Sequence, residues 1–195
     1  MKIKRLILWG GTLLLAAVGL VFWARGYAAV NAKYPSITEV LYAPGETGDI
    51  LGEMLVSVGN LQILEPDGFI TKYKISEEDV SYLDLRDTSR KMALVDITIT
   101  YNGEEESSPY DLFFKYIPYL QAAENIDACD SMFFGIVNEN NSIPEKLNKG
   151  DTYTLTGYFA AYRENMRPAT WENFKNQKFR LVIHYYPKSY IFEVN

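Results

Sequence analysis

The sequence predicts an all-β domain, an antiparallel β-sandwich, that follows one N-terminal transmembrane helix. The stretch Leu6–Ala24 has nineteen residues and no formal charge. The rest of the chain contains several short segments in which apolar and polar residues alternate, with turn residues between them. No long amphipathic helix pattern follows the first stretch. This combination favours a β-sandwich, with a closed barrel as the alternative.

The apolar stretch 6–24 is predicted to interact with a membrane. As a helix it would be about 28 Å long, close to the roughly 30 Å hydrocarbon core of a bilayer. Trp9 and Trp23 stand near its two ends, where indole rings favour the membrane–water interface, and Arg5 and Arg25 flank it.

Basic residues set the predicted orientation of this helix. Lys2, Lys4 and Arg5 precede it, whereas only Arg25 follows it closely. The positive-inside rule therefore places the N-terminus in the cytoplasm and residues 26–195 outside, in a single-pass protein of the cell membrane.

A signal peptide that is cleaved, giving a secreted protein, is the alternative to a retained anchor. Small residues at suitable spacing occur in Gly26-Tyr27-Ala28 and in Val30-Asn31-Ala32. The apolar run is longer than the 7–15 residues of a typical signal peptide core, which favours retention. We therefore divide the chain into an anchor over 1–25, a tether over 26–47 and an extracytoplasmic β domain over 48–195.

The charge of the chain is unevenly distributed. Its 195 residues include 19 Lys and Arg and 25 Asp and Glu. The first 25 residues hold four of the basic residues and no acid, which leaves 15 basic against 25 acidic residues and a formal net charge of −10 for the remainder. Such a surface repels nucleic acid, so nucleic acid is excluded as a partner of the domain.

Four segments have a clear strand pattern. In 52–64 the apolar face shifts by one residue after Gly59, which predicts a β-bulge at Gly59-Asn60. In 92–101 Ala93, Val95, Ile97, Ile99 and Tyr101 share one face, and Asn102-Gly103 follows and predicts a hairpin turn. The segments 152–159 and 178–186 also alternate, and Pro187-Lys188 turns the chain into a last strand.

The intervening segments have weaker patterns. Residues 65–91 are polar, and the acidic run after Ser76 is predicted to be a solvated loop rather than one capped helical turn. For 109–137 we expect a strand, a short helical or loop excursion near 120–130 and a strand at 131–137. Residues 163–177 are predicted to form a polar loop that contains Trp171.

The order of these segments resembles a known group of proteins. The strand GEMLVSVGNLQIL comes first, MALVDITITYNGEEE follows, and LNKGDTYTLTGYF and FRLVIHYY come later. This order is similar to that of telokin-like, immunoglobulin-type domains of unknown function on membrane-anchored surface proteins of Gram-positive bacteria. The resemblance covers roughly 48–195 and implies an immunoglobulin-like sandwich outside the membrane, without implying any catalytic residue. The lipid-attachment cysteine of many such proteins and the cysteine pair of antibody domains are both missing.

No residue pattern specifies catalysis or a cofactor. His184 is the single histidine and is predicted on the outer face of a strand beside Arg180, and no G-x-S-x-G, P-loop or G-x-G-x-x-G occurs. Cys129 lies among acidic residues, which would raise the pKa of its thiol. One histidine and one cysteine do not make a structural zinc site. Acidic clusters could offer oxygens to calcium, although none matches the twelve-residue calcium loop; they are Glu77-Glu78-Asp79, Asp84/Asp87, Glu104-Glu105-Glu106 and Asp127/Asp130. We predict no cofactor and no metal site, with calcium as the alternative.

Aromatic side chains are the remaining candidates for a binding surface. All fifteen tyrosines follow the anchor. They fill a sandwich core more often than they form a binding platform, but a patch of Trp171, Tyr110, Tyr116 and Tyr119 could hold a sugar or a peptide.

We therefore expect a non-enzymatic surface domain that binds an envelope protein, a peptide or a glycan. One alternative is a surface hydrolase with two carboxylates about 5–9.5 Å apart. The other is an accessory subunit of an envelope complex, for which the anchor offers no G-x-x-x-G motif.

Overall fold

The computed structural model describes residues 2–116, 118–122, 125–139, 141 and 143–194. The chain divides into two compact units, Met1–Thr38 and Glu39–Asn195.

The first unit consists mainly of helix α1, Lys2–Lys33. Within it, Trp9–Lys33 is long and apolar enough to cross a membrane, and an 18-residue stretch of it has a mean hydropathy of 1.8. The helix continues past the predicted anchor because the next residues include several alanines and no proline before Pro35, which disfavours helix at the residue before it. The predicted tether 26–47 is therefore not one irregular segment: 26–33 are helical, one strand occupies 38–42, and a second strand begins at Thr47.

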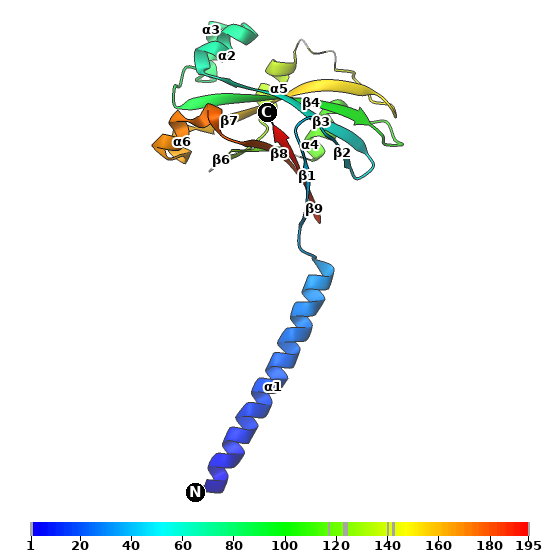
Figure 1. Ribbon diagram of the computed structural model, residues 1–195, viewed down its shortest axis with the longest axis vertical. Coiled ribbons are helices and arrows are strands. Elements are labelled where there is room, and N and C mark those ends of the chain that lie inside the picture. Colours follow the sequence, from blue (N-terminus) through cyan, green and yellow to red (C-terminus); the bar gives the residue numbers. More distant parts are fainter. Residues whose placement is uncertain (1, 117, 123–124, 140, 142, 195) are drawn as a thin grey trace. The chain divides into compact units, whose positions relative to one another are not determined.

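The second unit is a β-sandwich, as predicted (Figure 1). Within the described residues, nine strands make two sheets in the orders β1-β9-β8-β5-β6 and β2-β3-β4-β7. The pairings among β2 to β9 are antiparallel. The strands are β1 Thr38–Tyr42, β2 Thr47–Ile50, β3 Met54–Leu64, β4 Arg90–Tyr101, β5 Tyr119–Ala122, β6 Asn125–Ala128, β7 Thr152–Tyr162, β8 Phe179–Tyr185 and β9 Lys188–Val194.

The four clear strand predictions are confirmed by β3, β4, β7 and β8, and the last strand by β9. The bulge in β3 is confirmed as well, since its pairing with β4 shifts between Val58 and Leu61. Because of this shift, the apolar residues on both sides of the bulge face the same core.

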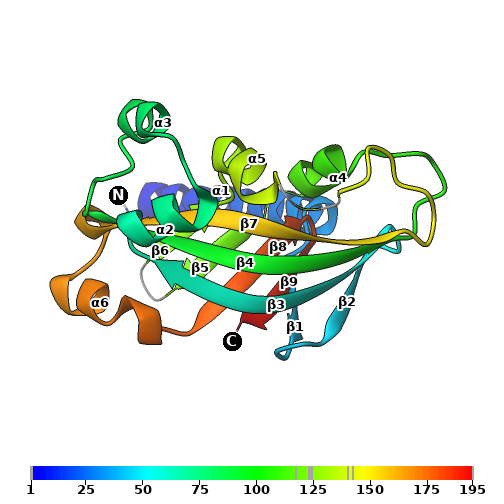
Figure 2. The same ribbon diagram turned by 90° about the horizontal axis from the view of Figure 1, so that it is seen from above.

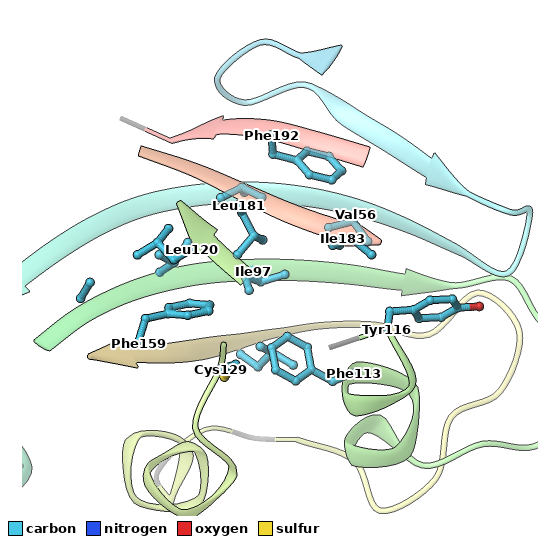
Figure 3. Packing of buried hydrophobic residues seen from close by; sticks show 14 of the residues in the cluster. Val56, Ile97, Phe113, Tyr116, Leu120, Cys129, Phe159, Leu181, Ile183 and Phe192 are labelled. Atoms are coloured by element: carbon cyan, nitrogen blue, oxygen red, sulfur yellow. The ribbon is translucent and has the colours of Figure 1, made fainter. Parts of the chain in front are cut away.

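The main core lies between the two sheets. Val56 and Ile97 from one sheet meet Leu181 and Phe192 from the other (Figure 3). The β2 side of this core needs a glycine: a Cβ on Gly48 would come within 2.7 Å of the stacked rings of Tyr42 and Phe192.

Short helices cover one half of the outer face of the four-stranded sheet (Figure 2). They are α2 Pro66–Tyr73, α3 Glu77–Tyr82 and α5 Ser131–Asn138. Met92 and Leu94 pack beneath them in a second core, which explains why β4 begins apolar on both faces. The uncovered half carries pairs of threonines, such as Thr98 and Thr154, whose hydroxyls lie 2.8 Å apart.

The predicted hairpin at Asn102-Gly103 is wrong. Both edges of β4 are already paired, with β3 and with β7, so no position remains for a returning strand. Instead, the loop leads to helix α4, Pro109–Lys115, whose N-terminus is capped by the Ser108 hydroxyl.

The predictions for 109–137 and 163–177 are also corrected. The expected strand at 131–137 is helix α5, which Asp130 caps, because its apolar residues follow helical spacing. The first strand expected in this segment is helix α4, and the helical or loop excursion expected near 120–130 is replaced by the strands β5 and β6. The acidic run after Ser76, which was expected to be a solvated loop, forms helix α3, and the Ser76 hydroxyl caps the N-terminus of this helix. The expected polar loop holds α6, Pro168–Glu172, between two 3-10 turns, η1 Arg163–Asn165 and η2 Phe174–Asn176.

Candidate functional site

The outer face of the five-stranded sheet, here called the open face, is the candidate binding surface. Within the described part of 39–194, α2, α3 and α5 pack on the other sheet, and the apolar residues of α4 and α6 join the main core. Neither core cluster includes a residue that points outward from the five-stranded sheet. That face therefore remains available for contacts with another molecule.

A shallow trough of about 230 Å³ is hollowed into the open face. It takes at least one lining residue from each of the five strands: Glu39, Tyr119, Gln121, Ile126, Val182, His184, Ser189 and Ile191. Since these residues come from every strand, the trough extends across the sheet.

Strand register explains how the trough is built. Tyr119 pairs with Val182, and Val182 pairs with Ile191, so these three residues form one row across β5, β8 and β9. Val182 and Ile191 are buried by their neighbours, although they point away from the main core. The ring of Tyr119 lies 5.8 Å from that of His184, at 59°. The row forms a largely apolar floor, and the His184 ring lies beside its Tyr119 end.

A second hollow, here called the acidic cleft, has a volume of about 310 Å³. It lies beside α4 and is lined by five carboxylate residues, Glu53, Glu104, Glu105, Glu106 and Asp111, together with Lys115 and neighbouring residues. Lysines at its margin pair with these acids: Lys149 with Glu104, and Lys146 with Glu106.

Glu53 is held firmly in this cleft. Its Oε2 accepts hydrogen bonds from Lys115 Nζ at 2.7 Å and from the Tyr116 hydroxyl at 2.6 Å. The bond from Lys115, then that from Tyr116, lowers the pKa of Glu53, and the same contact raises the pKa of Lys115. Burial, and then Glu53, raises the pKa of Tyr116 to about 12. The cleft is thus a set of ion pairs that fixes α4 and the loop before it.

The third cluster closes the side of the sandwich where β6 meets β7, here called the seam. Asp127 Oδ2 accepts a hydrogen bond from the Ala160 N–H at 2.5 Å, and the Asp130 N–H donates to the Tyr158 carbonyl at 3.0 Å. The Asn138 side chain donates to the Thr156 carbonyl and accepts from its N–H, both at 2.8 Å. The Asp127 and Asn138 side chains and the Asp130 N–H thereby satisfy backbone groups along the free edge of β7 and block further strand pairing there.

The seam perturbs two titratable groups. Burial raises the pKa of Asp127 to about 6, with a smaller contribution from the charge of Asp130. Burial also raises the pKa of Cys129 to about 12, with smaller contributions from Asp130 and Asp127. The predicted direction for the thiol is confirmed, but burial rather than its acidic neighbours is the main cause.

The four predicted patch residues are not brought together. Tyr119 lies in the trough, and Tyr110 is half exposed on α4, where its ring packs on Phe114 at 4.6 Å. Tyr116 and Trp171 are buried, so the prediction is wrong for them: their rings fill the core, and Lys91 Nζ lies 4.4 Å above the Trp171 ring.

The other predicted residues are placed as follows. Trp9, Trp23 and Arg25 are exposed on α1, and Arg5 lies in the same helix; their role at a membrane interface stays a prediction. His184 is exposed on the outer face of β8, as predicted. Among the residues that the structure describes, no three His, Cys, Asp or Glu side chains form a group that could hold a metal ion.

Sequence reasoning missed most of the trough. Gln121, Ile126 and Ser189 belong to strands that are too short or too mixed in composition for alternation to indicate a shared face. The available signal was the outward position of Val182 and His184, which the alternation of 178–186 did provide. A surface built from five strands needs their register, which is not local information.

Solved structures that match this chain come from several bacteria. An uncharacterized beta-sandwich protein of Clostridium difficile 630 matches with a TM-score of 0.48 and 8% identity over 82% of this chain and 97% of that one. A functionally unknown protein of Listeria monocytogenes EGD-e matches at 0.42 and 14% identity, over 71% of each chain. A conserved hypothetical protein of Bacillus anthracis matches at 0.45 and 12% identity, over 79% of this chain and 95% of that one.

Among curated proteins, no significant match is found. A family model does match: the one described as Domain of unknown function (DUF5028) aligns with residues 45–190. The matched segment begins just before β2 and ends within β9, so it takes in most of the sandwich. Since it also covers well over half of the sequence, the chain belongs to the DUF5028 family.

Proposed function

We propose that this protein is a non-enzymatic binding module, held at a membrane by α1, that uses its open face to contact a partner in the cell envelope. The observation that carries this proposal is the trough, which draws residues from all five strands of a sheet face that the domain's own helices leave uncovered. A rigid sheet holds such side chains in fixed positions, which suits recognition.

The proposed location follows from α1. Its length and composition suit a single membrane crossing. The excess of basic residues before the apolar run supports a cytoplasmic N-terminus and an external domain. The resemblance to telokin-like, immunoglobulin-type surface domains of Gram-positive bacteria supports the same location, and we include it in the proposal.

The contacts of the acidic residues support a binding role over the paired-carboxylate hydrolase. In the seam, Asp130 caps α5 through bonds from the Met132 and Phe133 N–H groups, and Asp127 binds the Ala160 N–H. In the acidic cleft, Glu53 is paired with Lys115. Carboxylates engaged in this way stabilise the fold, whereas a hydrolase needs two that face its substrate.

Site-specific photo-crosslinking tests the proposal. A photoreactive residue replaces Gln121 in the trough of the full chain, in membranes of the source organism. The matched control carries it at Tyr82, which is 82% exposed on α3. We expect one discrete adduct from position 121 that is missing from position 82. Equal adduct patterns at both positions, or none at position 121, would refute the use of the open face.

A further inference from the structure

The shape of the trough restricts what it can hold. Its lining residues extend from Ile126 on the edge strand β6 to Glu39 on the opposite edge strand β1. A ligand that fills the trough would therefore lie across the strands and could continue beyond the sheet at either edge. This geometry suits a linear polymer better than a compact molecule, which requires a deeper and more enclosed pocket.

The side chains of the trough combine apolar and hydrogen-bonding surfaces. The floor row of Tyr119, Val182 and Ile191 is apolar apart from one phenol hydroxyl. Beside it stand the Gln121 amide, which both donates and accepts hydrogen bonds, and the exposed imidazole of His184, whose cross-strand neighbour Ser189 is buried. A sugar ring presents the matching combination, since its C–H face packs on apolar and aromatic surface while its hydroxyl groups exchange hydrogen bonds at the rim.

The charges of the trough and of the domain narrow the class of polymer further. The trough contains one carboxylate, Glu39, and one imidazole, His184, and none of its lining residues is Lys or Arg. The chain after the anchor carries a formal net charge of −10. Such a domain repels polyanions, and one carboxylate is too little to select a basic peptide, so an uncharged polymer is favoured.

We propose that the trough binds a linear, uncharged polysaccharide segment that lies across the five strands. This inference depends on the proposed function, because it names the ligand class of the same face. Tyr119 packs against a sugar ring, and Gln121 exchanges hydrogen bonds with its hydroxyl or acetamido groups.

Calorimetric titration of the full chain in lipid nanodiscs tests this. Detergents with sugar head groups are avoided, since they would compete for the trough. The probes are the β-1,4-linked hexamers of N-acetylglucosamine and of glucose, polygalacturonate as a polyanion, and an uncharged extended octapeptide. We expect saturable binding of at least one neutral hexamer and none of polygalacturonate.

Three variants locate the binding. Tyr119→Ala and Gln121→Ala should each weaken binding of the hexamer by about three- to tenfold, the usual effect of one ring contact or one hydrogen bond. The control Tyr82→Ala should leave affinity unchanged. Circular dichroism checks that each variant is folded, and Tyr119→Leu, which also removes the ring, and Gln121→Glu replace any variant that is not.

Three outcomes overturn the inference: no binding of either neutral hexamer, binding that the trough variants leave unchanged, or tighter binding of the polyanion or the peptide. If the peptide binds and Tyr119→Ala weakens it, the open face still has its proposed function and only the ligand class is wrong. If crosslinking also gives no adduct at position 121, the proposed function itself fails.

Discussion

Replacement of Asp127 by Asn is predicted to stabilise the domain near neutral pH. Asp127 is partly buried in the seam, where its carboxylate accepts a hydrogen bond from the Ala160 N–H. An asparagine side-chain oxygen can accept the same bond, but it carries no charge. The substitution therefore removes the cost of burying a charge and keeps the contact that joins β6 to β7.

The sign and size of the effect follow from the pKa. Burial raises the pKa of Asp127 from 3.8 to about 6 in the folded chain. The neutral carboxyl is thus favoured by folding, and its stabilising contribution is fully present below about pH 4 and is lost as the pH rises through about 6. A difference of about two pKa units corresponds to about 3 kcal/mol, which partial exposure to solvent reduces to roughly 1–2 kcal/mol.

Urea unfolding between pH 4 and pH 8 measures this effect in the full chain. Trp171, which is buried, reports unfolding of the domain by fluorescence. We expect Asp127→Asn to match the wild type near pH 4 and to exceed its free energy of unfolding by roughly 1–2 kcal/mol at pH 7.5. Asp67→Asn, at an exposed carboxyl on α2, serves as the control. The pKa of Glu53 is lowered in the fold, so its ionised carboxylate stabilises the fold above about pH 4.5. Glu53 is present in the wild type and in both variants, so its contribution cancels when their free energies of unfolding are compared.

The reasoning is refuted if the difference between Asp127→Asn and the wild type is the same at both ends of this range. It is also refuted if the wild type is the more stable protein at pH 7.5. Either result would mean that the charged carboxylate is well solvated in the seam.

Three further predictions concern buried residues of the domain. Trp171→Ala should lower the free energy of unfolding by about 3–5 kcal/mol because it empties a core position, whereas Tyr110→Ala should change it by less than about 1 kcal/mol; equal effects in urea unfolding would contradict the burial of Trp171. Asn138→Ala should cost about 1–3 kcal/mol, since it leaves the backbone of Thr156 without its partners, and an unchanged thermal midpoint would contradict this. At pH 8 the Cys129 thiol of the folded chain should react with a maleimide more than about a hundredfold slower than that of the urea-unfolded chain, and rapid labelling of the folded chain would show that the seam is open.

Local patterns predicted the strands that form the centre of the sandwich. Alternation in β3, β4, β7 and β8 identified the faces that meet in the core, and it revealed the bulge at Gly59 because both apolar sets must point the same way. One or both faces of each strand pack against apolar neighbours, so the positions of its apolar residues indicate which face is buried.

Local patterns failed where distant partners decided the structure. Asn102-Gly103 has a strong turn signal, yet β7, fifty residues further on, already occupies the edge of β4 that a hairpin would need. Trp171 lies in a polar segment, and its burial depends on contacts such as Lys91 from β4, whose Nζ also donates to the Trp171 carbonyl at 2.9 Å. Neither fact has a signal within a window of ten or fifteen residues.

The sequence by itself determined an uncharged apolar run of membrane length, an acidic domain and most strands of its core, because each depends on composition or on a period of two. Only the tertiary structure decided which face of which sheet stays free of helices, and which side chains meet there. The trough shows the reason: Tyr119, Val182 and Ile191 are distant in sequence and become one surface through the hydrogen-bonded register of β5, β8 and β9.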